Sequence, residues 1–235
     1  MKQDICSIPI SEIFEPKQGC PFCKMRDMLE DRMATYITGA AMMEPDVRVE
    51  TNRLGFCKTH FDHILQRGSR LSVALILETL LAETEKDLMS VGTPIKKAIV
   101  AGDNRENSCF TCENIEKNML HLCSTVLSLW QSEEEFRELY ANQTHICVPH
   151  YHMITKYAQK KMNKKNLVPF MTVTSNLSRK YMQEVTGDVS HFCRMFDYRN
   201  AGGDWGNSKD SIERAIEYLT GRPIDTSTQT EGKNR

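Results

Sequence analysis

The sequence lacks the long apolar stretches that membrane helices and secretory signals require. Its longest unbroken apolar run is the five residues Val73–Leu77, whereas a membrane-spanning helix needs about 20 apolar residues. The first nine residues also lack the apolar segment of about 7–15 residues that marks a secretory signal. We therefore expect a cytoplasmic protein that does not contact a membrane.

The sequence also has little net charge, because 30 Lys and Arg residues oppose 31 Asp and Glu residues, which leaves −1. A balanced charge creates no strong field to attract nucleic acid. Tyr157 is the single aromatic residue within the basic run at 156–165, whereas a single-strand groove stacks successive bases on several aromatic side chains, so a nucleic-acid-binding regulator is an alternative that we do not favour. A protein or a small molecule is the expected partner. The basic run consists of Lys156, Lys160, Lys161, Lys164 and Lys165.

Alternation of polar and apolar residues, the mark of strands, is almost missing. Apolar residues instead recur three and four positions apart, which predicts an all-α fold. Ser132 and Glu135 have the spacing of a capping box, and residues 45–56 read as a connector. The expected helices cover approximately residues 22–40, 57–66, 69–91, 109–130, 132–140, 149–162, 166–198 and 208–220. Residues 166–198 are expected to form either one long helix or a pair broken at Gly187.

What the sequence does contain is nine cysteines, an odd number that fits poorly with a closed set of disulfides. Eight Cys and His residues form two copies of one pattern, Cys-x2-Cys followed by Cys-x2-His. The gap between the halves is 33 residues in the first copy and 34 in the second. The candidate ligands are Cys20, Cys23, Cys57 and His60 in the first copy, and Cys109, Cys112, Cys147 and His150 in the second.

This duplication predicts two structural zinc sites, one in each copy. Structural zinc is held by four Cys and His ligands in a tetrahedron. A Cys-x2-Cys turn at a helix N-terminus places two thiolates near the positive end of the helix dipole. A Cys and a His three positions apart share one face of a helix. Each copy therefore holds a complete ligand set, and the protein is expected to bind two zinc ions.

Two other chemistries use similar residues. The turn Cys20-Pro21-Phe22-Cys23 resembles the active site of thioredoxin-like proteins, so a thiol-disulfide oxidoreductase that uses Cys20 and Cys23 is an alternative. Such a turn follows a buried strand, whereas residues 14–19 do not read as a strand. An iron–sulfur cluster is a second alternative, although clusters are mostly bound by cysteine alone.

The repeat predicts a tandem duplicated helical unit with a C-terminal helical extension that packs on the repeats. We expect a first zinc unit at 1–91, a linker at 92–108, a second zinc unit at 109–165, the extension at 166–222 and a disordered tail at 223–235. Near the end of the extension, residues 196–210 are rich in aromatic and paired polar residues. Arg199 and Trp205 in this stretch are candidates for a ligand or partner site.

Four segments together resemble a family of uncharacterised bacterial proteins. They are the CPFC turn, Met42–Arg48, the GFCxxH half-site, and Phe196–Asn200 with Asp204-Trp205-Gly206. The resemblance spans residues 1–222. The family is classed as a domain of unknown function and sometimes carries the label of an ABC-transporter substrate-binding protein. It implies no activity, and the transporter label would require an export signal that the N-terminus lacks.

Closed four-ligand sites leave no open position for water or substrate, so catalysis at zinc is not expected. We therefore expect a cytosolic zinc-binding helical protein that acts as a binding or regulatory module rather than as an enzyme.

Overall fold

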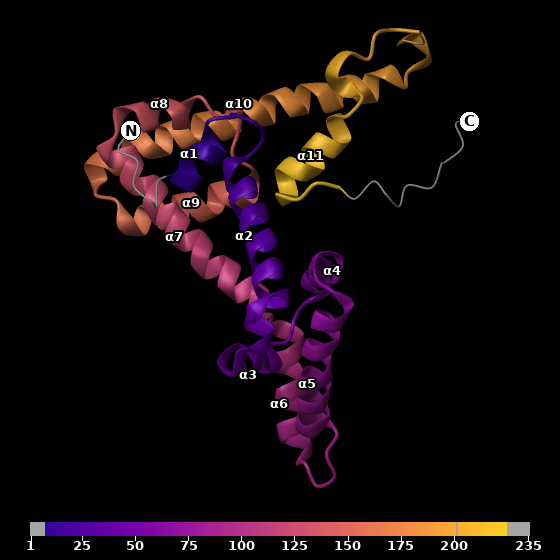
Figure 1. Ribbon diagram of the computed structural model, residues 1–235. Coiled ribbons are helices and arrows are strands. Elements are labelled where there is room, and N and C mark those ends of the chain that lie inside the picture. The colour runs from indigo at the N-terminus through magenta and orange to yellow at the C-terminus, as the bar shows by residue number, and fades with distance from the viewer. Residues whose placement is uncertain (1–7, 201, 225–235) are drawn as a thin grey trace. The chain divides into compact units, whose positions relative to one another are not determined.

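The computed structural model describes residues 8–200 and 202–224, and this part of the chain is all-α, as expected. It contains eleven α-helices, three short 3₁₀ helices and no strand (Figure 1). The α-helices are α1 (Ile8–Phe14), α2 (Pro21–Thr38), α3 (Pro45–Leu54), α4 (Lys58–Arg67), α5 (Arg70–Leu88), α6 (Ile95–Asn107), α7 (Phe110–Ser132), α8 (Glu134–Ala141), α9 (Val148–Lys161), α10 (Lys164–Met195) and α11 (Ser211–Thr220).

The helices that periodicity predicts are present, and their ends differ from the prediction by a few residues. Gly68 ends α4, where its N–H donates to the carbonyl of Ile64 at 2.8 Å. Gly221 ends α11 in the left-handed conformation that glycine adopts without strain (φ 68°). The predicted capping box is wrong, because Ser132 belongs to α7 and its hydroxyl donates to the carbonyl of Ser128 at 2.9 Å.

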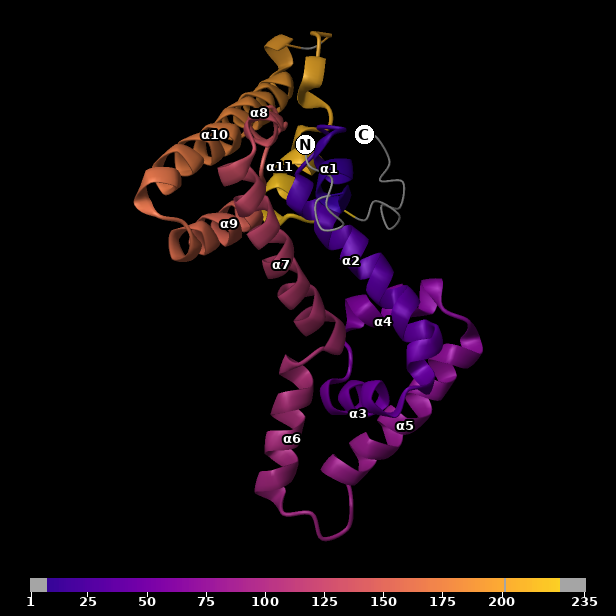
Figure 2. The ribbon, with the colours of Figure 1, turned by 60° about the vertical axis from the view of Figure 1, so that its left-hand side comes forward.

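Three helices lie where the sequence analysis placed none. The short helix α1 precedes the first Cys-x2-Cys turn, and α3 occupies the predicted connector. The predicted linker at 92–108 contains α6. The loop at 89–94 connects α6 to α5, and the two helices contact each other (Figure 2). Leu88 on α5 faces Gly102 on α6, and Arg105 on α6 donates to Asp87 at 2.9 Å. These contacts explain why a segment without a strong apolar pattern is helical.

The chain divides into two compact units that do not follow the order of the repeats. One unit contains the described residues up to Met25 together with those from Leu122 onward, and the other contains Arg26–His121. The second unit is thus inserted into the sequence of the first. Both boundaries fall inside helices, α2 and α7. This division differs from the predicted units at 1–91 and 109–165, because residues 1–91 contribute to both compact units.

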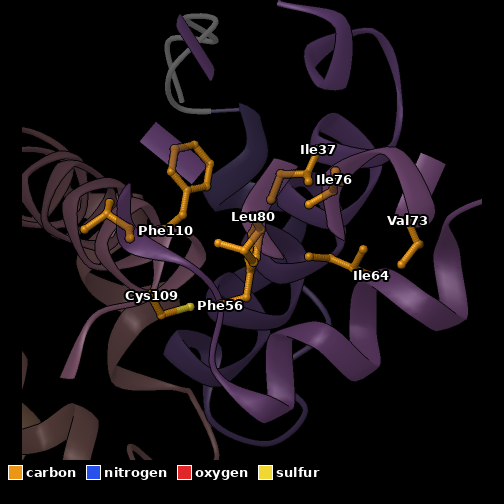
Figure 3. Packing of buried hydrophobic residues seen from close by; sticks show 9 residues of the cluster. Ile37, Phe56, Ile64, Val73, Ile76, Leu80, Cys109 and Phe110 are labelled. Atoms are coloured by element: carbon orange, nitrogen blue, oxygen red, sulfur yellow. The ribbon is translucent and has the colours of Figure 1, made fainter. Parts of the chain in front are cut away.

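The core of the inserted unit is mostly aliphatic and includes Cys109, a predicted metal ligand. Figure 3 shows Cys109 and Phe110, at the start of α7, among buried side chains from α2, α4 and α5. The ring of Phe110 also lies 6.2 Å from that of Phe56, between the centroids. The start of α7 is therefore fixed by hydrophobic packing as well as by the candidate site. The other labelled members are Ile37, Ile64, Val73, Ile76 and Leu80.

The core of the other unit contains a cluster of aromatic side chains. Phe14 on α1 packs against Phe136 and Tyr140 on α8, with centroid distances of 5.3 and 5.9 Å. Tyr140 is fully buried, and its hydroxyl is paired with that of Thr174 on α10 at 3.0 Å. Phe22, directly before Cys23 in α2, joins this cluster through Phe14 at 6.2 Å. One half of each candidate site is thus attached to a hydrophobic core.

The predicted C-terminal extension forms α10 and α11, and both helices contact α9. Most of the predicted disordered tail, residues 225–235, lies outside the described residues. Within the described part of the chain, no helix combines the length and the apolar character that crossing a bilayer requires.

Candidate metal centres

The eight predicted ligands gather into two groups of four, and in each group the ligand atoms lie within 4.8 Å of one another. We call the first group centre A and the second centre B. Centre A consists of Cys20, Cys23, Cys147 and His150. Centre B consists of Cys57, His60, Cys109 and Cys112.

The predicted pairing of the two halves is wrong, because each Cys-x2-Cys turn meets the Cys-x2-His of the other repeat. The ligands of centre B are therefore nested in sequence between those of centre A. Longer loops oppose this arrangement only weakly. Pairing within each repeat would close two loops of about 34 residues. The observed pairing closes one loop of 124 residues, from Cys23 to Cys147, and one of 49 residues, from His60 to Cys109. The longer loops cost roughly 1–2 kcal/mol in loop entropy. Packing of the helices decides the pairing instead.

Centre A is compact and mostly buried. The Sγ atoms of Cys23 and Cys147 are 3.6 Å apart. Nδ1 of His150 lies 3.1 Å from Cys147, 3.3 Å from Cys23 and 3.7 Å from Cys20. Cys20, Cys147 and His150 are buried, whereas Cys23 is half-buried. One nitrogen and three sulfur atoms thus converge on one point.

Centre B repeats this geometry with greater exposure. The Sγ atoms of Cys57 and Cys112 are 3.9 Å apart. Nδ1 of His60 lies 3.2 Å from Cys57, 3.3 Å from Cys109 and 3.4 Å from Cys112. His60 and Cys109 are buried, Cys57 is half-buried and Cys112 is exposed.

These spacings fit a tetrahedral zinc ion. Zn–S bonds of about 2.3 Å and Zn–N bonds of about 2.0–2.1 Å give tetrahedral edges of roughly 3.8 Å between two sulfurs and 3.6 Å between sulfur and nitrogen. The two S–S separations, 3.6 and 3.9 Å, lie on either side of the first value. The sulfur–nitrogen separations are 3.1–3.7 Å in centre A and 3.2–3.4 Å in centre B, mostly a few tenths of an ångström shorter than the second. The Sγ pairs are too far apart for a disulfide, whose S–S bond is about 2.05 Å long. The two groups can each hold one metal ion.

Every ligand pair lies at the N-terminus of a helix. Pro21 and Phe110, each directly after a ligand, begin α2 and α7. Cys57 and Cys147 are the N-cap residues of α4 and α9, with nearly equal ψ angles of 164° and 160°. Each centre therefore receives the positive ends of two helix dipoles, which stabilise thiolate charge.

Burial and hydrogen bonding shift the pKa values of the thiols in different directions. Burial and the neighbouring Cys109 thiolate raise the pKa of Cys112 to about 12. Burial also opposes ionisation of Cys109, but its hydrogen bonds with His60, Cys112 and Cys57 together outweigh burial and lower the pKa of Cys109 to about 6. In centre A, hydrogen bonds with Cys147 and Cys20 raise the pKa of Cys23. A metal ion would displace the protons that remain.

Hydroxyl groups join the two halves of each centre. In centre A, Thr144 donates to the carbonyl of Gly19 at 2.8 Å. In centre B, Ser108 donates to the carbonyl of Leu54 at 2.7 Å. When the repeats are aligned on their ligands, Thr144 is equivalent to Leu54 and Gly19 is equivalent to Ser108. The donor therefore precedes the Cys-x2-His half in centre A and the Cys-x2-Cys half in centre B. Both centres keep one such link.

Residues beyond the predicted ligands also surround the centres. The carbonyl of Gly221, after α11, lies 3.5 Å from Sγ of Cys23 in centre A. In centre B, the carboxylate of Glu30 on α2 lies 3.8 Å from Nε2 of His60. The sequence analysis missed both residues. Gly221 directly follows the predicted helix at 208–220, where glycine is common as a helix end, and Glu30 is one acidic residue among many in a helix.

The candidate residues Arg199 and Trp205 engage local partners. Arg199 forms an ion pair with Asp197 at 2.7 Å. Trp205 packs on Phe192 and Phe196 near the end of α10, at centroid distances of 5.4 and 5.6 Å. A ligand or partner site at Arg199 and Trp205 stays a prediction.

Fold and sites together define an all-α protein with two Cys3His groups able to bind metal. The chain belongs to a family of unknown function, DUF6062, whose model matches residues 1–226. This match confirms the resemblance that the motifs indicate, and the family's description assigns no function. No curated protein and no solved structure matches the chain.

Proposed function

We propose that centres A and B each bind one structural zinc ion and that the protein acts as a binding or regulatory module. The observation that carries this proposal is the convergence of four ligand atoms within 4.8 Å in each centre. Three thiolates and one imidazole are a typical structural zinc set, and four protein ligands leave no open position for a substrate. Bound zinc would stabilise helices that are far apart in sequence.

The same geometry favours one ion over the alternatives. An iron–sulfur cluster distributes its protein ligands over several irons, whereas each centre here converges on a single point. In a thiol-disulfide oxidoreductase, Cys20 and Cys23 would need to act as a free pair, but both lie against Cys147 and His150. The predicted reducing cytosol keeps such thiols available for metal.

The partner that we propose is a protein or a small molecule rather than nucleic acid. The five lysines at the end of α9 and the start of α10 are exposed. Lys160 and Lys161 lie in the last turn of α9, where they complement the helix dipole without any ligand. Zinc would then keep the helical surface in one shape, which lowers the conformational cost of binding.

Metal analysis of protein purified under reducing conditions tests the zinc proposal. We expect about two zinc ions per chain. Replacement by Co²⁺ should give the intense visible bands of tetrahedral thiolate coordination. Chelation of the metal should lower the helical circular dichroism and the melting temperature.

The chain offers a control among its cysteines. Cys193 is exposed and belongs to neither centre, so Cys193→Ser should retain both ions. Protein that is fully folded and contains no zinc would contradict the proposal.

A further inference from the structure

The carboxylate of Glu30 is buried beside centre B. Its side chain is only 3% exposed, which is rare for glutamate and costs free energy unless the charge is compensated. Its Oε1 lies 3.8 Å from Nε2 of His60, and its Oε2 lies 3.8 Å from Nδ1 of His63. The two imidazoles belong to successive turns of α4, so one carboxylate faces both.

The His60 ring has two distinct sides. Nδ1 faces the three sulfur atoms of centre B at 3.2–3.4 Å. Nε2 points away from them, is buried, and makes no hydrogen bond within the described part of the chain. The carboxylate of Glu30 lies on the Nε2 side of the ring. A movement of roughly 1 Å would bring its oxygen to hydrogen-bond distance from Nε2.

Metal coordination settles which nitrogen carries the proton. A neutral imidazole that binds a metal through Nδ1 must keep its proton on Nε2. A carboxylate that accepts this proton fixes the orientation of the ring and makes the coordinating nitrogen more basic. We infer that Glu30 is the positioning residue of centre B, which accepts the Nε2–H of His60 and holds Nδ1 toward the metal. This inference rests on the proposed metal binding.

His63 supports Glu30 from the other side. Its ring is perpendicular to that of His60, with centroids 6.1 Å apart, and its side chain is 33% exposed. Nδ1 of His63 can donate to Oε2 while Oε1 serves His60. Glu30 is therefore held between a buried ligand and a residue that reaches solvent.

The second repeat has no carboxylate at the position equivalent to Glu30. Alignment of the Cys-x2-Cys turns places Met119 of the second repeat opposite Glu30. A thioether cannot accept a strong hydrogen bond from imidazole, so the repeat does not duplicate the carboxylate. Substitutions at Glu30 should therefore act on one of two metal ions, and the other ion serves as an internal reference.

Zinc transfer to a coloured chelator tests the inference in the zinc-loaded full chain. We expect Glu30→Gln to accelerate loss of one zinc ion about 10–100-fold, the usual effect of removing an outer hydrogen-bond partner, while the second ion leaves at the wild-type rate. Glu30→Met, which copies the second repeat, should have a larger effect, and Glu30→Asp a smaller one. Unchanged release from both centres overturns the inference. Faster release from both assigns Glu30 to folding alone and also overturns it.

A second measurement needs no variant at Glu30. Long-range ¹H–¹⁵N spectra of the zinc-loaded wild-type protein report which nitrogen of His60 carries the proton. We expect a protonated Nε2 and a metal-bound Nδ1, with the Nε2 proton protected from solvent exchange. A proton on Nδ1, or rapid exchange at Nε2, overturns the inference even if the Glu30 variants do not fold. Wild-type protein that binds no zinc refutes the proposed function instead, so the two failures are distinguishable.

Discussion

Centres A and B have the same four ligand types but different surroundings. In centre A, three ligands are buried, and the carbonyl of Gly221 contacts the fourth, Cys23. In centre B, Cys112 is exposed, while the carboxylate of Glu30 lies beside the histidine. The ligand motif sets the metal chemistry, and residues from other helices decide how accessible and how rigid each centre is.

Removing ligands in pairs should have the largest effect, because structural zinc contributes on the order of 10 kcal/mol in small domains. The crossed pairing predicts that Cys20→Ser/Cys147→Ser loses one zinc ion and keeps the other. Cys20→Ser/Cys57→Ser should lose both. Zinc content per chain, measured by elemental analysis, distinguishes the cases. Pairing within each repeat predicts the opposite pattern, so the reverse result would refute the crossed arrangement.

Chemical modification should separate the centres by exposure. Among the eight candidate ligands, a small alkylating reagent should reach Cys112 first, because its side chain is exposed whereas Cys20 and Cys147 are buried. Cys193 is also exposed, but its labelling should release no zinc. Zinc release monitored during alkylation should therefore show one early and one late ion. Mass spectrometry of partly modified protein identifies the labelled residues. Early labelling of Cys20 or Cys147 would mean that centre A is the accessible one.

Gly221→Ala should weaken centre A alone. Its φ of 68° is unfavourable for residues with a Cβ, and the new Cβ would lie 3.3 Å from Sγ of Cys147. We expect a loss of about 1–2 kcal/mol of stability in urea denaturation and faster zinc loss from one centre.

Gly187→Ala is the matched control for this change. Gly187 lies inside α10 with nothing within 4 Å of its added Cβ. The change should stabilise the protein by about 0.5–1 kcal/mol. Equal destabilisation by both glycine variants would disprove the special role of Gly221.

The smallest effects should come from the hydroxyl links. Ser108→Ala and Thr144→Val each remove one hydrogen bond between the halves of a centre, worth about 0.5–1.5 kcal/mol. Ser108 is half-buried whereas Thr144 is exposed, so water can replace the lost donor more easily at Gly19. We expect Ser108→Ala to destabilise more in urea denaturation. A larger loss for Thr144→Val would contradict this ranking.

Much of the local structure could be predicted. Apolar periodicity located the main helices, and the repeated motif identified all eight members of the two centres. Helix α6 escaped prediction because its contacts with Leu88 and Asp87 are tertiary. Glu30 escaped because a buried carboxylate and a solvated one look alike in sequence. Its role arises only when α4 brings His60 and His63 to it.

The sequence by itself determined the all-α class, the ligand types and their position at helix starts, since these depend on residue spacing within one or two turns. Only the tertiary structure decided which turn meets which half-site. Each centre needs one Cys-x2-Cys turn and one Cys-x2-His half-site, and the two copies of each offer the same ligands. Either pairing therefore satisfies the metals equally well, and the difference in loop entropy is small. Specific packing, such as that of Phe110 against Phe56 in the core beside Cys109, selects the crossed pairing.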